Sequence, residues 1–153
     1  MARPLRWLAW AAGALVVLMM AVTVVDVVGR YFLDRPLKGS AEATEFLLAC
    51  LVFAGIPIAA ATGEHIRIDL LDHMLPRTLL RWQRVFGSLV AALVIGFVAW
   101  RLLLRGNELA RLGDRSSHLD LPNAPFAWFM AAMAALAVIV FLSVAWRALR
   151  YRD

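Results

Sequence analysis

Long apolar runs alternate with short polar connections along the chain, and four of these runs are long enough to cross a bilayer. A helix needs about 20 predominantly apolar residues to span the hydrocarbon core of a membrane. The predicted spans cover about residues 7–31, 42–63, 82–104 and 121–146, and no soluble domain fits between them. The pattern therefore predicts an all-α integral membrane protein, with four transmembrane helices in a single membrane domain over residues 1–153.

The first apolar run is uncharged from Trp7 to Val25 and follows a short basic segment. A signal peptide also begins this way, but its apolar core is only about 7–15 residues long, so we expect an uncleaved anchor. Asp26 and Arg30 lie four residues apart, which places them on one helical face where they can pair. An intramembrane proton carrier is the alternative interpretation of Asp26. The nearby arginine and the position near the helix end argue against it.

The second apolar run is preceded by Ser40, which can cap a helix, and by the acidic residues Glu42 and Glu45. The positive end of the helix dipole favours acidic residues in a first turn. The other interpretation is that one of them pairs with an arginine of a neighbouring helix or partner subunit, and the sequence favours neither. Within the run, Gly55 and Ala59 have a spacing that permits close approach of another helix.

The connection between the second and third spans contains a short amphipathic pattern. Its apolar residues share one helical face, and they are Ile66, Leu70, Leu71, Met74 and Leu75. This pattern predicts a helix at about 66–75 that lies in the membrane interface. His65 and His73 lack a convincing set of further ligands, so we expect no metal site here.

The composition agrees with a membrane protein, because 63% of the residues are hydrophobic. The net charge of +5 comes from basic residues near the ends of the apolar runs, where they can anchor the helices to membrane lipids. They form neither a patch nor a tail, so the charge does not indicate a nucleic-acid partner. Cys50 is the only cysteine, which excludes an internal disulfide, a Cys-x-x-Cys pair and a cysteine zinc site.

The apolar runs lack the side chains that catalysis or ion coupling would need. No histidine lies inside a run, which argues against haem held between two helices. No carboxylate lies near the middle of a run, where a self-contained proton-coupled exporter would need one. A serine nucleophile motif and a glycine-rich phosphate loop are also missing. We therefore expect no enzyme and no cofactor, and a subunit of an assembly rather than a complete machine.

Several short motifs follow one another along the chain. They are Gly29-Arg30-Tyr31-Phe32, Leu51-Val52-Phe53-Ala54-Gly55, His65-Ile66-Arg67-Ile68-Asp69-Leu70-Leu71 and Ser116-Ser117-His118-Leu119-Asp120-Leu121-Pro122, followed by Trp128. In this order and spacing they resemble the small membrane subunit of tripartite ATP-independent periplasmic (TRAP) transporters. That family often has an aromatic residue and two adjacent acids before the second span. Here only Glu42 of the stretch Gly39-Ser40-Ala41-Glu42 matches.

The resemblance implies a non-catalytic subunit in the bacterial inner membrane. It would scaffold a large multi-span permease subunit that takes up organic acids, of the dicarboxylate or sialic-acid class, together with sodium. A periplasmic binding protein would deliver the substrate. We expect the ends of the second helix and their neighbours to position the subunit in the complex, through Arg30, Glu42, Glu45, His65 and Asp69.

Two other functions compete with this interpretation. The chain could anchor an unrelated enzyme or redox complex, and bound haem or quinone would then favour that function. It could also be a small exporter that acts alone as an oligomer, which transport by this chain alone in liposomes would favour. Isolation with a large permease subunit would favour the transporter interpretation.

The distribution of basic residues predicts the orientation in the membrane. With four spans both termini share a side, and that side holds nine basic residues: Arg3, Arg6, Arg67, Arg77, Arg81, Arg84, Arg147, Arg150 and Arg152. The other side holds seven: Arg30, Arg35, Lys38, Arg101, Arg105, Arg111 and Arg115. Cytoplasmic connections carry the excess of basic residues, so we expect cytoplasmic termini. The periplasmic residues expected to dock the binding protein are then Arg35, Lys38, Arg105 and Arg111.

A reporter that works only outside the cytoplasm is expected to stay inactive when fused after Asp153, because that terminus is predicted to be cytoplasmic. A reporter that works only inside the cytoplasm is the matched control. An active external reporter and a silent internal one would contradict the predicted orientation.

Overall fold

The structure is a computed structural model that describes residues 3–35, 37–62 and 77–150. The described part forms four α-helices, α1 (Arg3–Phe32), α2 (Ser40–Thr62), α4 (Arg77–Leu112) and α5 (Ala124–Arg150), and contains no strand. Each helix is long and apolar enough to cross a membrane. The prediction of an all-α protein with four transmembrane helices is thus confirmed. The expected interfacial helix at 66–75 lies outside the described residues.

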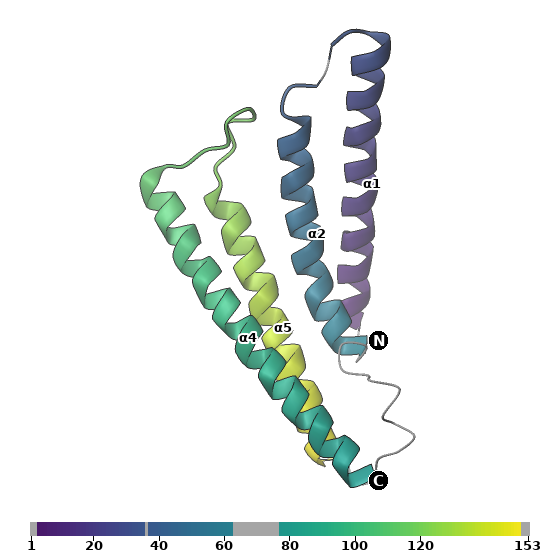
Figure 1. Cartoon of the computed structure of the whole chain (residues 1–153), viewed down its shortest axis with the longest axis vertical. Coiled ribbons are helices and arrows are strands. Elements are labelled where there is room, and N and C mark those ends of the chain that lie inside the picture. Colours follow the sequence, from purple (N-terminus) through teal and green to yellow (C-terminus); the bar gives the residue numbers. More distant parts are fainter. Residues whose placement is uncertain (1–2, 36, 63–76, 151–153) are drawn as a thin grey trace.

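The helices form two antiparallel hairpins, α1 with α2 and α4 with α5 (Figure 1). Helix α2 packs against α5, so the spatial order is α1, α2, α5, α4. The two central helices run in the same direction, since Phe46 stacks on Phe126 near their starts, with ring centroids 4.1 Å apart, and Ala60 clusters with Ala137 further along. Helix α1 is the most exposed, because none of its most apolar 18-residue window is buried inside the chain.

Helix α5 buries a stripe of side chains, all but one of them alanine, between its two neighbours. The stripe recurs every three or four residues, as one helical face does, and consists of Ala124, Ala127, Ala131, Ala134, Ala137, Phe141 and Ala145. Small residues let helix backbones approach closely where the surrounding lipid supplies no hydrophobic drive. Ala132 and Ala135, on the other hand, face outwards, so only part of the alanine-rich segment packs.

Three helices meet where Ala60 of α2, Ala92 of α4 and Phe141 of α5 are buried together. Helix α2 presents its face with Ala54, Pro57 and Ala60 to the interior. The neighbouring Gly55 lies off this face, and a Cβ added to it would meet nothing within 4 Å. The close helix approach expected at Gly55 is therefore made through a different set of small residues.

Helix α4 ends in a Schellman motif, the hydrogen-bonded turn that closes many helices on a left-handed residue. Gly113 adopts a φ of 64°, its N–H donates to the carbonyl of Ala110, and the N–H of Asp114 donates to the carbonyl of Leu109. The start of α5 is set by Asn123, whose carbonyl accepts the N–H of Ala127. The helix begins at Ala124 rather than at the expected residue 121, because the preceding residues are used in the loop.

Gly106 of α4 allows the indole of Trp128 to lie directly on the helix backbone. A Cβ added at Gly106 would lie 2.5 Å from Cδ1 and 2.7 Å from Nε1 of Trp128. The indole N–H donates to the side-chain oxygen of the adjacent Asn107, at 3.2 Å. The contact thus fixes α5 on α4 both by shape and by a hydrogen bond.

Replacing this glycine by alanine is expected to destabilise the α4–α5 hairpin. Alanine gains up to about 1 kcal/mol of helix propensity, but overpacking costs about 1–3 kcal/mol, and the indole must leave Asn107. Thermal unfolding of Gly106→Ala in detergent should show a lower midpoint than the wild type. The matched control is Gly96→Ala on the same helix, where the new Cβ would lie 3.7 Å from Val138. Equal midpoints for both variants would contradict the tight contact.

Candidate functional site

The two connections that join the helices of each hairpin lie at the same end of the molecule (Figure 1). One is the short segment between α1 and α2, and the other is the loop 113–123 between α4 and α5. Here they are called the loop end. Most of the site residues expected from the sequence that the structure describes lie at this end.

Glu42, in the first turn of α2, binds the loop of the other hairpin. Its Oε1 accepts the backbone N–H of Ser117 at 2.8 Å, and its Oε2 accepts those of His118 at 3.1 Å and Leu119 at 3.0 Å. Hydrogen bonds from N–H groups to a carboxylate are among the strong ones in proteins. Within the described part of the chain, the partners of Glu42 are thus three backbone N–H groups rather than an arginine of a neighbouring helix. Pairing with an arginine of a partner subunit stays a prediction.

The loop is held in shape by its own hydrogen bonds. The N–H of Ser116 donates to the carbonyl of Leu121 at 2.9 Å, and that of Asn123 donates to the carbonyl of Asp114 at 3.2 Å. Arg115 binds both the carboxylate of Asp120 at 2.8 Å and its carbonyl at 3.0 Å. These bonds stabilise Asp120 in the left-handed region, at a φ of 52°, which non-glycine residues seldom adopt.

Gly39 brings the α1–α2 connection against this loop. Its φ is 80°, and a Cβ there would lie 2.8 Å from the side chain of Leu119. Its carbonyl accepts the N–H of Ala43, the first bond of α2. Gly39 rather than Ser40 is thus the N-cap. Its backbone angle and its close contact with Leu119 both require glycine at this position.

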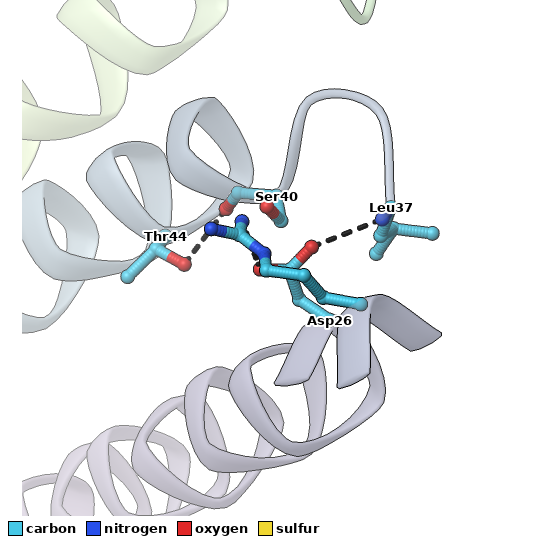
Figure 2. A network of polar contacts seen from close by, with 5 residues as sticks. Asp26, Leu37, Ser40 and Thr44 are labelled. Carbon is cyan, nitrogen blue, oxygen red and sulfur yellow. Dashed lines mark hydrogen bonds and ion pairs between the residues drawn. The ribbon is translucent and has the colours of Figure 1, made fainter. Parts of the chain in front are cut away.

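Asp26 ties the end of α1 to the connection that leads into α2. One of its carboxylate oxygens accepts a guanidinium N–H of Arg30 at 2.8 Å, and the other accepts the backbone N–H of Leu37 at 3.0 Å (Figure 2). The predicted pairing with Arg30 is confirmed. Figure 2 also shows the adjacent first turn of α2, where Thr44 donates to the carbonyl of Ser40.

Gly29 lets the connection fold back on the last turn of α1. Its carbonyl accepts the N–H groups of Leu33 at 3.3 Å and Arg35 at 2.9 Å. A Cβ at Gly29 would lie 2.7 Å from the carbonyl oxygen of Arg35, a distance that side chains do not tolerate. The glycine of the Gly29-Arg30 motif is therefore required by a close approach of two backbone segments.

The other residues expected from the sequence make fewer contacts or lie outside the described residues. Glu45 is exposed one turn after Glu42 and has no hydrogen bond or ion pair within the described part of the chain. The four expected docking residues are all exposed at the loop end, and Arg105 is paired with Glu108 at 2.7 Å. They are Arg35, Lys38, Arg105 and Arg111. His65 and Asp69 lie outside the described residues.

The sequence did not predict that Asp26 accepts a backbone N–H of the α1–α2 connection. It also did not predict that three backbone N–H groups of the 113–123 loop donate to Glu42. The Ser116–Pro122 motif lies in the segment that binds Glu42. The donors themselves are backbone N–H groups, however, and these cannot be recognised from the side chains in a sequence. Across residues 3–35, 37–62 and 77–150, no group of three or more His, Cys, Asp and Glu side chains could hold a metal ion.

Comparison with known proteins gives the family. The family model for the DctQ component of tripartite ATP-independent periplasmic transporters matches residues 19–151. The sialic acid TRAP transporter permease protein SiaT of Haemophilus influenzae is 24% identical over 132 residues, which are 86% of this chain and 20% of that protein. The ectoine TRAP transporter small permease protein TeaB of Halomonas elongata is 38% identical over 88 residues, 57% of this chain and 46% of that protein.

The matched regions span about a fifth and just under half of the lengths of these two relatives. The family match covers most of this chain, from the first span into the last helix. It confirms the resemblance drawn from the motifs and indicates a multi-pass inner-membrane protein of a transporter family. The chain belongs to the DctQ component family of the tripartite ATP-independent periplasmic transporters.

Proposed function

We propose that this chain is a non-catalytic scaffold for a large multi-span permease subunit. The observation that carries the proposal is the family match over residues 19–151 on a chain whose spans are uncharged in their middles. A span without buried ionisable groups can pack and position, but it offers no site to couple ions. Substrate and ion ligands are then expected on the large subunit.

The transported substrate is proposed to be an organic acid of the dicarboxylate or sialic-acid class, delivered by a periplasmic binding protein and carried inward with sodium. One relative is named for sialic acid, which supports this class, and the other is named for ectoine. The family therefore includes members with different substrates. A scaffold without a substrate site of its own fits that variety.

The loop end is proposed to hold the subunit in its working shape and to receive the binding protein. Glu42 and Asp26 fix the two connections by hydrogen bonds to backbone N–H groups. Helix α4 has 36 residues, or about 54 Å at 1.5 Å per residue, against a hydrocarbon core of about 30 Å. Its last turns therefore reach beyond the membrane with Arg105 and Arg111, next to the ordered loop.

The scaffold role predicts that this chain co-purifies with the large permease subunit and that uptake requires both. Sodium-dependent uptake of the organic acid into proteoliposomes is expected only when the two subunits and the binding protein are combined. Full uptake by the large subunit and the binding protein alone would contradict the proposal, as would the failure of the two subunits to associate.

Variants at the start of α2 test the positioning role in the same co-purification assay. Glu42→Gln keeps the size of the side chain but replaces the charged acceptor of three backbone N–H groups by a neutral amide, which makes weaker hydrogen bonds. We expect assembly to weaken by roughly an order of magnitude, because hydrogen bonds to a charged acceptor are about twice as strong as those to a neutral one. Glu45→Gln, one turn away, should assemble normally, and Asp69→Ala tests the exit of the same helix. Normal assembly of Glu42→Gln would reduce Glu42 to an ordinary helix-start residue.

Charge reversal tests the docking surface. Replacing Arg35, Lys38 and Arg111 by glutamate should weaken binding of the binding protein, measured by surface plasmon resonance on subunits in nanodiscs, and should lower uptake. The effect should be larger at low salt, because exposed charges are screened over about 8 Å at physiological ionic strength. Arg105→Glu should have a smaller effect, since Glu108 already neutralises Arg105. Arg147→Glu at the opposite end is the control, and unchanged docking in all loop-end variants would contradict the surface.

A further inference from the structure

The turn from Ser116 to Leu119 has the geometry of an anion-binding site. Three successive backbone N–H groups, of Ser117, His118 and Leu119, converge on one carboxylate at distances of 2.8–3.1 Å. Successive N–H groups that point into one concavity bind anions in many proteins. In this chain the bound anion is supplied by Glu42, a residue more than seventy positions earlier.

The side chain of Ser116 gives an independent indication of the same site. Ser116 is 9% exposed, and its hydroxyl oxygen is buried with no hydrogen-bond partner of ordinary geometry among the described residues. This hydroxyl belongs to the residue directly before Ser117, at the edge of the same turn. A hydroxyl hydrogen can rotate to suit its acceptor. The site thus has a fourth donor that a more freely placed anion could use.

The donors remain in place by means that do not involve Glu42. The N–H of Ser116 binds the carbonyl of Leu121, and Arg115 binds Asp120 across the same turn. Asp114 also accepts the side-chain N–H of Asn123 at 2.9 Å. When the donors of a site are already oriented, little conformational entropy is lost as the site binds its ligand. The turn should therefore keep its shape when the carboxylate of Glu42 is removed.

We propose that the Ser116–Leu119 turn is a carboxylate-binding site and that Glu42 is its tethered ligand. When the Glu42 side chain is removed, the site takes a free carboxylate such as formate. Ser117 and His118 are exposed, so the site can be reached from solvent. A tethered ligand has a high effective concentration, so free carboxylates at moderate concentration do not displace it from the wild type. This proposal does not depend on the proposed scaffold role.

The ligand also joins the two hairpins, because Glu42 belongs to α2 and the turn connects α4 to α5. A free carboxylate fills the site without making this join. Chemical rescue of a Glu42 variant should therefore restore the hydrogen bonds of the turn and leave α2 detached from it. This difference separates occupation of the site from the cross-link that Glu42 makes.

The test is backbone hydrogen exchange of the full chain in nanodiscs. In Glu42→Ala, exchange at Ser117, His118 and Leu119 should be about tenfold faster or more, since each amide loses a hydrogen bond to a charged group. Sodium formate should slow exchange at these three amides in a saturable way, and equal sodium chloride should not. The wild type and Glu45→Ala should not respond to formate. In Glu42→Ala, the further change Ser116→Ala should weaken the formate effect.

Glu42→Gln is the second variant, because its amide fills the space and should leave formate without effect. Three results would overturn the proposal: equal slowing by chloride, no response of Glu42→Ala to formate, or fast exchange at the amides of Ser116 and Asn123 in Glu42→Ala. The last result would show that the turn needs Glu42 to keep its shape.

Discussion

Backbone N–H groups that leave a helix near the membrane must find acceptors, because unsatisfied ones cost several kcal/mol where water is scarce. Two carboxylates at the loop end meet this requirement. Asp26 accepts the N–H of Leu37, and Glu42 accepts three from the opposite hairpin. They fix the α1–α2 connection to the end of α1, and the 113–123 loop to the start of α2. The way the two hairpins are joined at the loop end depends on these four hydrogen bonds, whereas the 113–123 loop keeps its own shape through bonds within it.

Below the loop end the helices are held by contact between small residues. Lipid tails are as apolar as the helices, so burial of apolar surface contributes little to helix association, and close packing contributes more. The alanine stripe of α5 and the contact of the Trp128 indole with the backbone at Gly106 supply such packing. The large side chains lie on the outer faces, where Phe97, Trp100 and Leu93 of α4 are more than half exposed. A subunit with this distribution has a rigid centre and an apolar surface suited to lipid or to another membrane protein.

The sequence predicted the features that follow from residue spacing along one helix. It did not predict those that depend on contacts between segments far apart in the chain. Four spans follow from run lengths, and the Asp26–Arg30 pair follows from a four-residue spacing. The partner of Glu42 could not be found in this way, because its donors are backbone groups that any sequence has. Gly29 belonged to a motif whose physical reason the sequence did not give, and Gly106 stood in the sequence as an ordinary glycine. Their roles appear only where Arg35 and Trp128 come within 3 Å of a missing Cβ.

The hydrogen bonding of the 113–123 loop limits where the protein can be engineered. Loops are usually the segments that accept inserted tags, since their backbone groups face water. Here the amides of Ser116 to Leu119 and of Asn123 are already bound, and Gly39 leaves no space beside Leu119. An epitope or a fluorescent protein placed in this loop would displace bonds that hold two hairpins together. The connection that looks most open in the amino-acid sequence is therefore one of the least suitable for an insertion.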